Sequence, residues 1–127
     1  KQGIACWSGN DDESHDARHQ HGSHGVISVT SNIIPSLMRQ LMDNENIELN
    51  NRLQSLMQWL FCEPNPIAIN TTLMMTGAVP PNFRLPYIAL TKEQRQQGFD
   101  LLNELDPTER VGDLLAVLDN DAFKYCI

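Results

Sequence analysis

The sequence predicts an α/β fold in which two strand–helix units of a parallel sheet lead into a small helical bundle. The best predicted strand spans residues 25–32, where four β-branched residues follow Gly25. Apolar residues then recur from Ile34 to Met42 at spacings of three and four, which is typical of a helix buried on one side. Pro35 stands in its first turn, where the missing N–H costs nothing. A nearly continuous apolar strand that passes directly into a helix is typical of a parallel sheet covered by helices.

The first strand–helix unit is predicted upstream of this stretch. Residues 4–8 form a short apolar run that ends at Gly9, so we expect another buried strand with Trp7 in the core. Acidic residues 11–13 then suit the positive end of a helix. That helix, over residues 12–21, carries few apolar side chains and is expected to be mostly solvated. Consecutive units of this kind form parallel sheets.

Beyond a polar break at residues 43–46, the pattern becomes helical. Residues 49–61 predict a strongly periodic helix, and residues 67–76 predict a shorter one that stops at Gly77. Prolines at 80, 81 and 86 predict an extended connection, and Thr91 with Gln94 forms a capping box that opens a helix reaching Leu105. Residues 114–121 fit either a helix or a strand. Two strands make a poor sheet, so their edges are expected to be covered by other strands.

Composition excludes several classes of partner. The 127 residues suffice for one domain with a core, and the net charge of −7 argues against nucleic-acid and anionic-membrane partners. No apolar stretch approaches the ~20 residues of a membrane helix. Three widely spaced cysteines indicate reduced thiols in an intracellular compartment.

The histidine-rich segment is the one candidate metal site. His15 and His19 stand at i and i+4 and share a helix face, with His21, His24 and several aspartates nearby. Since no other part of the sequence supplies a fixed third ligand, we interpret the segment as a polar helix and predict no metal site.

Four motifs resemble the dihydrodipicolinate synthase (4-hydroxy-tetrahydrodipicolinate synthase) family, and its plant-type branch in particular. They are W-S-G-N-D-D-E at 7–13, G-V-I-S-V-T-S-N at 25–32, W-L-F-C-E-P-N-P-I-A-I-N-T at 59–71 and F-R-L-P-Y at 83–87. They occur in the family's order and spacing. The likeness loosens after Leu90, where V-G-D at 111–113 and D-N-D at 119–121 echo the plant-type tail.

The resemblance implies a specific architecture. The family is a (β/α)8 TIM barrel with a C-terminal helical domain. Residues 1–43 would be the last two βα units of the barrel, and residues 44–127 the helical domain and tail. Because a full barrel needs roughly 250 residues, the chain is expected to be the closing part of a larger enzyme.

The resemblance also implies a chemistry. The family condenses pyruvate with aspartate semialdehyde through a lysine Schiff base in lysine biosynthesis, without a cofactor. The lysines here are Lys1, Lys92 and Lys124, and none stands at the end of a predicted buried strand, where such a lysine is desolvated. The resemblance implies that the Schiff-base lysine, the tyrosines that relay protons and the arginine that holds the second substrate all lie upstream of these residues, so we expect no catalytic residue in this chain. By resemblance, Gly9 and Ile27 line the pyruvate pocket; the alternative is that Gly9 is only a turn residue and Ile27 only barrel core.

Two functional hypotheses follow. In the first, the chain is part of a plastid-type synthase, inactive until another chain or segment completes the barrel, with pyruvate bound only by the complete enzyme. In the second, it is a truncated, non-catalytic relative that serves as an interaction subunit of a larger assembly. The resemblance implies the chloroplast stroma, with the cytoplasm as the alternative, and an oligomer.

Overall fold

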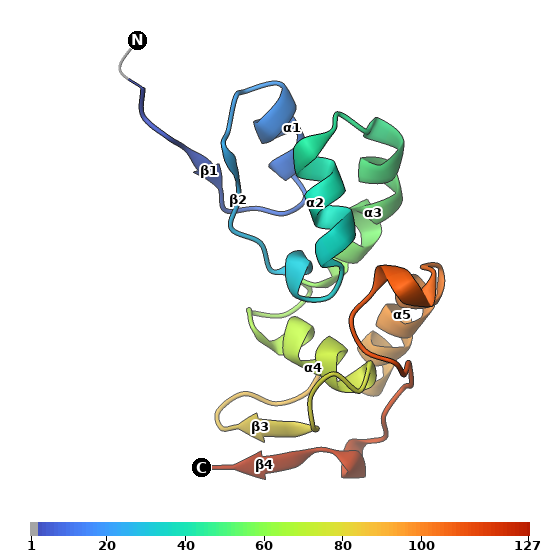
Figure 1. Ribbon diagram of the computed structural model, residues 1–127. Coiled ribbons are helices and arrows are strands. Elements are labelled where there is room, and N and C mark those ends of the chain that lie inside the picture. The colour runs from blue at the N-terminus through green and yellow to red at the C-terminus, as the bar shows by residue number, and fades with distance from the viewer. Residues whose placement is uncertain (1–2) are drawn as a thin grey trace.

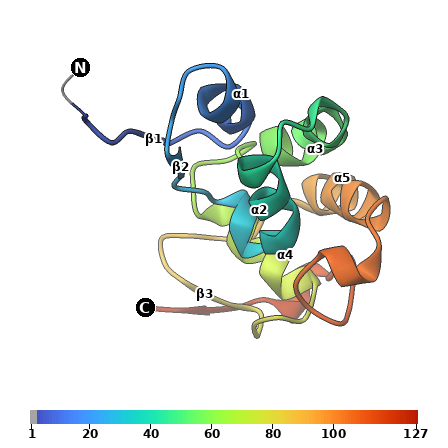
Figure 2. The same ribbon diagram turned by 45° about the horizontal axis from the view of Figure 1, so that its top comes forward.

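A computed structural model describes residues 3–127 and has an α/β architecture. Within that range it contains five α-helices and two small two-stranded sheets, which lie at opposite ends of the helical body (Figures 1 and 2). The elements in chain order are β1 (Trp7–Ser8), α1 (Ser14–His19), β2 (Gly25–Val26), the 3₁₀ turn η1 (Thr30–Asn32), α2 (Pro35–Asp43), α3 (Ile47–Trp59), α4 (Ile67–Met75), β3 (Asn82–Arg84), α5 (Lys92–Asn103), the 3₁₀ turns η2 (Pro107–Glu109) and η3 (Asn120–Ala122), and β4 (Lys124–Cys126).

The first sheet confirms the predicted parallel strand–helix units. β1 and β2 run parallel with Trp7 opposite Gly25 and Ser8 opposite Val26, and α1 connects them. α2 follows β2 after η1 and lies beside α1 (Figure 1).

Both strands are shorter than the sequence predicts. The expected strand over residues 25–32 ends at Val26, and Thr30–Asn32 turn into a 3₁₀ helix. The reason is a tertiary contact, because the backbone N–H groups of Val29 and Thr30 bond to the carboxylate of Asp11 instead of to a neighbouring strand.

The prediction that Trp7 lies in the core is wrong for this chain. Trp7 is 56% exposed, and Ile4 in the same apolar run is also exposed. Residues 3–6 extend away from the rest of the molecule (Figure 1), so no described segment covers this run.

The helix after β1 is also less solvated than its composition predicts. Ser14 and His15 are buried, and His15 accepts a hydrogen bond at its Nε2 from the backbone nitrogen of Asn46, 3.1 Å away. α1 therefore packs against the connection between α2 and α3.

The helices predicted after β2 are confirmed, and their ends follow from local chemistry. Pro35 opens α2, and the Asn46 side chain caps α3 by accepting from the backbone nitrogen of Leu49. The capping box of Thr91 and Gln94 is present at the start of α5. None of the helices among residues 3–127 is both long enough and apolar enough to cross a lipid bilayer.

One main hydrophobic core joins most of the molecule. It contains buried side chains from α2, α3, α4 and α5 together with Ile33 and Ile34, and Val26 of β2 packs against it. The cluster thus runs continuously across the predicted boundary between residues 43 and 44, and the division into two domains stays a prediction.

The second sheet was not predicted as a sheet. β3 lies in the expected extended connection, and the chain's last strand, β4, pairs with it in parallel, with Phe83 opposite Tyr125. Phe83 and Phe123 pack with Met74 in a small second core. In the ambiguous segment, residues 114–119 form no helix or strand.

Candidate functional site

The structure places Gly9 and Ile27 side by side. Each directly follows the last residue of its strand, and the backbone nitrogen of Ile27 donates to the carbonyl oxygen of Ser8 at 2.9 Å. The two residues therefore occupy neighbouring positions at the carboxyl end of the sheet, which is where ligands bind in parallel α/β folds.

Both residues face open space in this chain. Ile27 is 77% exposed, and a Cβ built on Gly9 would meet no heavy atom within 4 Å. No neighbour among the described residues therefore requires glycine at position 9. A ligand approaching along this edge would meet the backbone of Gly9 directly.

Asp11 fixes the two loops that carry these residues. Its Oδ2 accepts hydrogen bonds from the backbone nitrogens of Val29 and Thr30, at 3.0 and 2.9 Å, and from the Thr30 hydroxyl at 2.9 Å. Asp11 is buried, and its carbonyl oxygen accepts from the Ser14 hydroxyl at 2.6 Å. The loop after β1 is thus tied both to the loop after β2 and to the start of α1.

Sequence reasoning missed this role of Asp11. The run Asp11–Asp12–Glu13 favours a solvated helix start, and nothing in it distinguishes one acid from the next. Only Asp11 of the three is buried.

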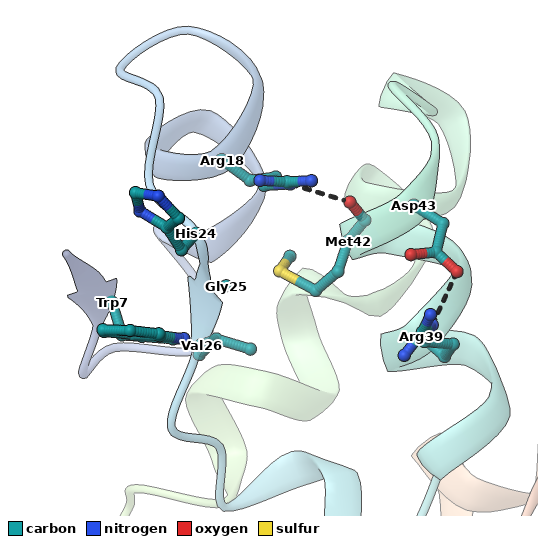
Figure 3. A pocket seen from close by; sticks show the side chains of 8 residues that line it. All are labelled: Trp7, Arg18, His24, Gly25, Val26, Arg39, Met42 and Asp43. Carbon is teal, nitrogen blue, oxygen red and sulfur yellow. Dashed lines mark hydrogen bonds and ion pairs between the residues drawn. The ribbon is translucent and has the colours of Figure 1, made fainter. Parts of the chain in front are cut away.

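A cavity beside β2 is lined by neighbours of the two candidate residues but not by Gly9 or Ile27 themselves. It has a volume of about 360 Å³ and is formed by β1, β2, α1 and α2 (Figure 3). Val26 and Met42 point toward each other across it, and Arg18 reaches the carbonyl oxygen of Met42 at 3.1 Å. A smaller cavity of about 260 Å³ lies between the loop after β1 and the C-terminal part of α3. It is lined by Asn10, which directly follows Gly9 in the sequence.

The sequence model of the Dihydrodipicolinate synthetase family matches residues 1–105. The chain belongs to this family. It is 51% identical over 124 residues to the 4-hydroxy-tetrahydrodipicolinate synthase, chloroplastic, of Zea mays, a match that covers 96% of this chain and 33% of the maize protein. It is 50% identical over 125 residues to synthase 1, chloroplastic, of Arabidopsis thaliana, which covers 97% and 34%.

Solved structures of the family have the same fold over the matched region. The dihydrodipicolinate synthase of Thermotoga maritima matches with a TM-score of 0.71 at 31% identity, covering 79% of this chain and 36% of that one. The Acinetobacter baumannii enzyme, crystallised in complex with pyruvate, matches with a TM-score of 0.70 at 30% identity, covering 80% and 37%. The chain thus spans about a third of the length of the relatives it matches.

Two of the three lysines, Lys92 and Lys124, are among the described residues, and both come well after the first sheet in the sequence. Lys92 is exposed and forms an ion pair with Asp119, with its Nζ 2.7 Å from Oδ1. Lys124 is exposed at the start of β4. Lys1 lies outside the described residues.

The histidine segment does not assemble a ligand set within residues 3–127. The rings of His15 and His19 are tilted by 52° to each other with centroids 4.7 Å apart, and no group of three or more potential metal ligands converges there or elsewhere in that range. The Nε2 of His15 is engaged by Asn46, and the Nε2 of His19 lies 2.7 Å from the carbonyl oxygen of Leu41. Both side chains thus join α1 to its neighbouring elements.

Proposed function

We propose that this chain is the C-terminal third of a plant-type 4-hydroxy-tetrahydrodipicolinate synthase. Residues 1–43 would supply the last two βα units of a (β/α)8 barrel, and residues 44–127 its helical domain. Three observations support this: about 50% identity to plant synthases, coverage of about a third of their length, and a parallel β1–β2 pair connected by a helix.

The reaction proposed for the complete enzyme is the condensation of pyruvate with aspartate semialdehyde through a lysine Schiff base. The nucleophile must be a neutral amine, which a desolvated lysine at a strand end provides. Lys92 and Lys124 are exposed and stand at the starts of α5 and β4, away from the β1–β2 sheet in the sequence. The reactive lysine is therefore proposed to come from the remainder of the enzyme, and this chain to be inactive alone.

The contribution proposed for this chain is one wall of the pyruvate pocket. Gly9 would let the substrate approach the backbone, and Ile27 would present its strand-end backbone and side chain beside it. Their adjacency at the carboxyl end of the sheet is the observation that carries this proposal. Because the plant relatives are described as chloroplastic, the proposed location is the plastid stroma.

A chimera tests the proposal directly. The matching third of the maize enzyme is replaced by this chain, and the condensation of pyruvate with aspartate semialdehyde is measured. We expect an active chimera and no activity from the isolated chain. A chimera that folds but does not condense the substrates would overturn the proposal and favour a non-catalytic interaction subunit, for which the exposed Trp7 and Ile27 would be the contact surface.

Substitutions of two glycines distinguish an effect on the pyruvate pocket from an effect on folding. Gly9→Val in the chimera is expected to raise the KM for pyruvate at least tenfold, because the new side chain enters the pocket. Gly3→Val is the matched control, since both glycines are exposed and a Cβ added at either would have no heavy atom within 4 Å. Equal KM values for the two variants would show that Gly9 does not line the pyruvate pocket.

A further inference from the structure

His15 of α1 is buried where this helix meets the connection between α2 and α3 (Figure 1). The backbone nitrogen of Asn46 donates a hydrogen bond to Nε2 of His15 at 3.1 Å. Asn46 is also the residue that caps α3, because its side-chain oxygen accepts from the backbone nitrogen of Leu49 at 2.9 Å. The ring of His15 therefore ties α1 to the N-terminus of α3.

This hydrogen bond fixes the position of the ring proton. A backbone N–H can only donate, so Nε2 of His15 carries no hydrogen, and the neutral ring holds its single N–H at Nδ1. That N–H lies toward Asp16, with Nδ1 3.4 Å from the carboxylate oxygen Oδ1. The bond from Asn46 to His15 therefore exists only while the ring is neutral.

Protonation of His15 would break the bond. A hydrogen on Nε2 would face the N–H of Asn46, so two donors would meet without an acceptor between them. A charged ring with an unpaired N–H is costly to bury, so the ring is expected to move toward water. The carboxylate of Asp16 would attract the charged ring, but its side chain is 61% exposed and solvent screens the attraction.

The hydrogen bonds that join α1 to α2 do not depend on a neutral ring. Nε2 of His19 lies 2.7 Å from the carbonyl oxygen of Leu41, which can only accept, so His19 donates there in either charge state. Arg18 donates to the carbonyl oxygen of Met42 at 3.1 Å. A charged His19 would repel a charged His15, since the two ring centroids are 4.7 Å apart. Protonation thus weakens the link of α1 to α3 and leaves its links to α2 in place.

The other charged groups on the elements packed against His15 do not pair with it within residues 3–127. Besides Arg18 on α1, they are Arg39 and Asp43 on α2, Glu45 in the connection, and Glu48 and Arg52 on α3. Arg39 pairs with Asp43 and Arg52 with Glu109, while Glu45 and Glu48 are exposed. Asp16 is the one carboxylate that forms an ion pair with His15 in that range.

We infer that His15 is a pH-sensitive latch between α1 and the N-terminus of α3, closed when the ring is neutral and open when it is protonated. Histidine titrates at about pH 6.5, so the latch opens in slightly acidic solution. The open form takes up the proton without losing a hydrogen bond, whereas the closed form loses the bond to Asn46. The stability that the latch provides is therefore present at higher pH and is lost as the pH falls. Because the Ser14 hydroxyl at the start of α1 bonds to the carbonyl oxygen of Asp11, the latch acts on the helix that supports the loop after β1.

The test follows hydrogen exchange of the Asn46 amide by NMR at about pH 8 and about pH 5.5, relative to the intrinsic exchange rate at each pH. Its protection should fall about tenfold at the lower pH, as expected for the loss of one buried hydrogen bond. In His15→Gln the side-chain oxygen can accept from Asn46 at either pH, so the protection should not change with pH. His21→Gln, at an exposed histidine, is the matched control and should keep the native response.

A second measurement needs no substitution. NMR of the ring nitrogens distinguishes a bare nitrogen from one that carries a hydrogen, and at about pH 8 Nε2 of His15 should be bare. Loss of Asn46 protection should follow protonation of this ring over the same pH range. A hydrogen on Nε2 at about pH 8 would overturn the inference, as would a protection of Asn46 that is independent of pH or that falls equally in His15→Gln. The measurements use this chain alone, so their outcome is separate from the activity of the chimera.

Discussion

The carboxylate of Asp11 lies 2.9 Å from both the backbone nitrogen and the hydroxyl oxygen of Thr30. This contact joins two loops whose contacting residues are 19 positions apart in the sequence. Gly9 lies in the first loop and Ile27 in the second. The same oxygen also accepts from the backbone nitrogen of Val29. The buried Asp11 side chain thus adds a second link between the loops of the two candidate site residues, beside the backbone hydrogen bond from Ile27 to Ser8.

Asp11→Ala is expected to lower the free energy of unfolding by about 2–3 kcal/mol, because three donors lose their acceptor and two of them belong to the buried Thr30. Urea unfolding measures the change. Asp12→Ala is the matched control, since Asp12 is exposed and contributes only its backbone oxygen to a hydrogen bond, from Gln54. Equal losses in the two variants would contradict the role given to Asp11.

Gly98→Ala is expected to destabilise the protein although alanine is the better helix former. A Cβ at position 98 would lie 2.1 Å from Cζ2 of Trp59, and that indole is held in place by a 3.1 Å hydrogen bond from its Nε1 to the carbonyl oxygen of Gln94. Overpacking of this kind costs about 1–3 kcal/mol.

The control for this contact is Gln97→Ala at the neighbouring exposed position of α5. Thermal unfolding should show a lower Tm for Gly98→Ala and no loss for Gln97→Ala. Trp59→Phe combined with Gly98→Ala should recover part of the lost stability. A stabilised Gly98→Ala variant would mean that helix propensity outweighs the clash.

Arg95→Met is expected to loosen the C-terminal strand. Arg95 is buried, and no carboxylate within residues 3–127 forms an ion pair with it. It donates to the carbonyl oxygen of Leu90 and to Oδ1 of Asn120, and its guanidinium lies 5.0 Å from the ring centroid of Phe123. Burial lowers the pKa of Arg95 from its ordinary value. Methionine fills a similar volume but leaves both acceptors unbonded.

Hydrogen exchange measures this effect. Amides of residues 124–126 should exchange faster in Arg95→Met, while those of α3 should keep their protection. Gln96→Met, at the next and exposed position of α5, serves as the control. Unchanged amide exchange in β4 would show that the contacts of Arg95 do not stabilise the C-terminal strand.

The ion pair of Arg52 and Glu109 predicts a pH dependence of stability. The hydrogen bond from Arg52 lowers the pKa of Glu109 from its ordinary 4.5. Because the folded-state pKa lies below the unfolded one, the stabilisation is present above pH 4.5 and is lost as the pH falls through the folded-state value. Both side chains are partly exposed, so solvent screening limits the contribution to about 1 kcal/mol or less.

Denaturant unfolding of the native chain and of Glu109→Gln between pH 7 and pH 3 tests this dependence. The native chain should be more stable at pH 7, and the difference should shrink as the pH falls below the ordinary glutamate value of 4.5. In an Arg52→Gln background, Glu109→Gln should have little effect at any pH. A difference that persists unchanged at pH 3 would contradict the ion pair as its cause.

The helical part of the fold could be predicted because its determinants are local. The 3.6-residue spacing of apolar side chains in α3, the proline at the start of α2 and the capping box of Thr91 and Gln94 all act within one helix. The parallel pairing of β1 and β2 could be predicted for a similar reason, since strand–helix–strand units have few alternative arrangements. The family motifs identified Gly9 and Ile27 as candidates, and their roles stay predictions.

The elements that sequence reasoning missed depend on partners that are distant in the chain. β3 and β4 are three residues each and are separated by 39 residues, so neither stands out by periodicity. The burial of His15 depends on the backbone of Asn46, which is 31 residues away. Trp7 stays exposed because among residues 3–127 only the neighbouring strand, with the His24 ring 5.6 Å away, lies against it.

The sequence alone determined the family, the helices and the direction of the first two strands, because local spacing and motif order carry that information. The tertiary structure decided where β2 ends, which acid is buried and how the tail closes the second core, because each depends on hydrogen bonds or contacts between residues far apart in the chain. Asp11 illustrates both sides: its place in the family motif is visible in the sequence, whereas its bonds to Val29 and Thr30 exist only in the folded chain.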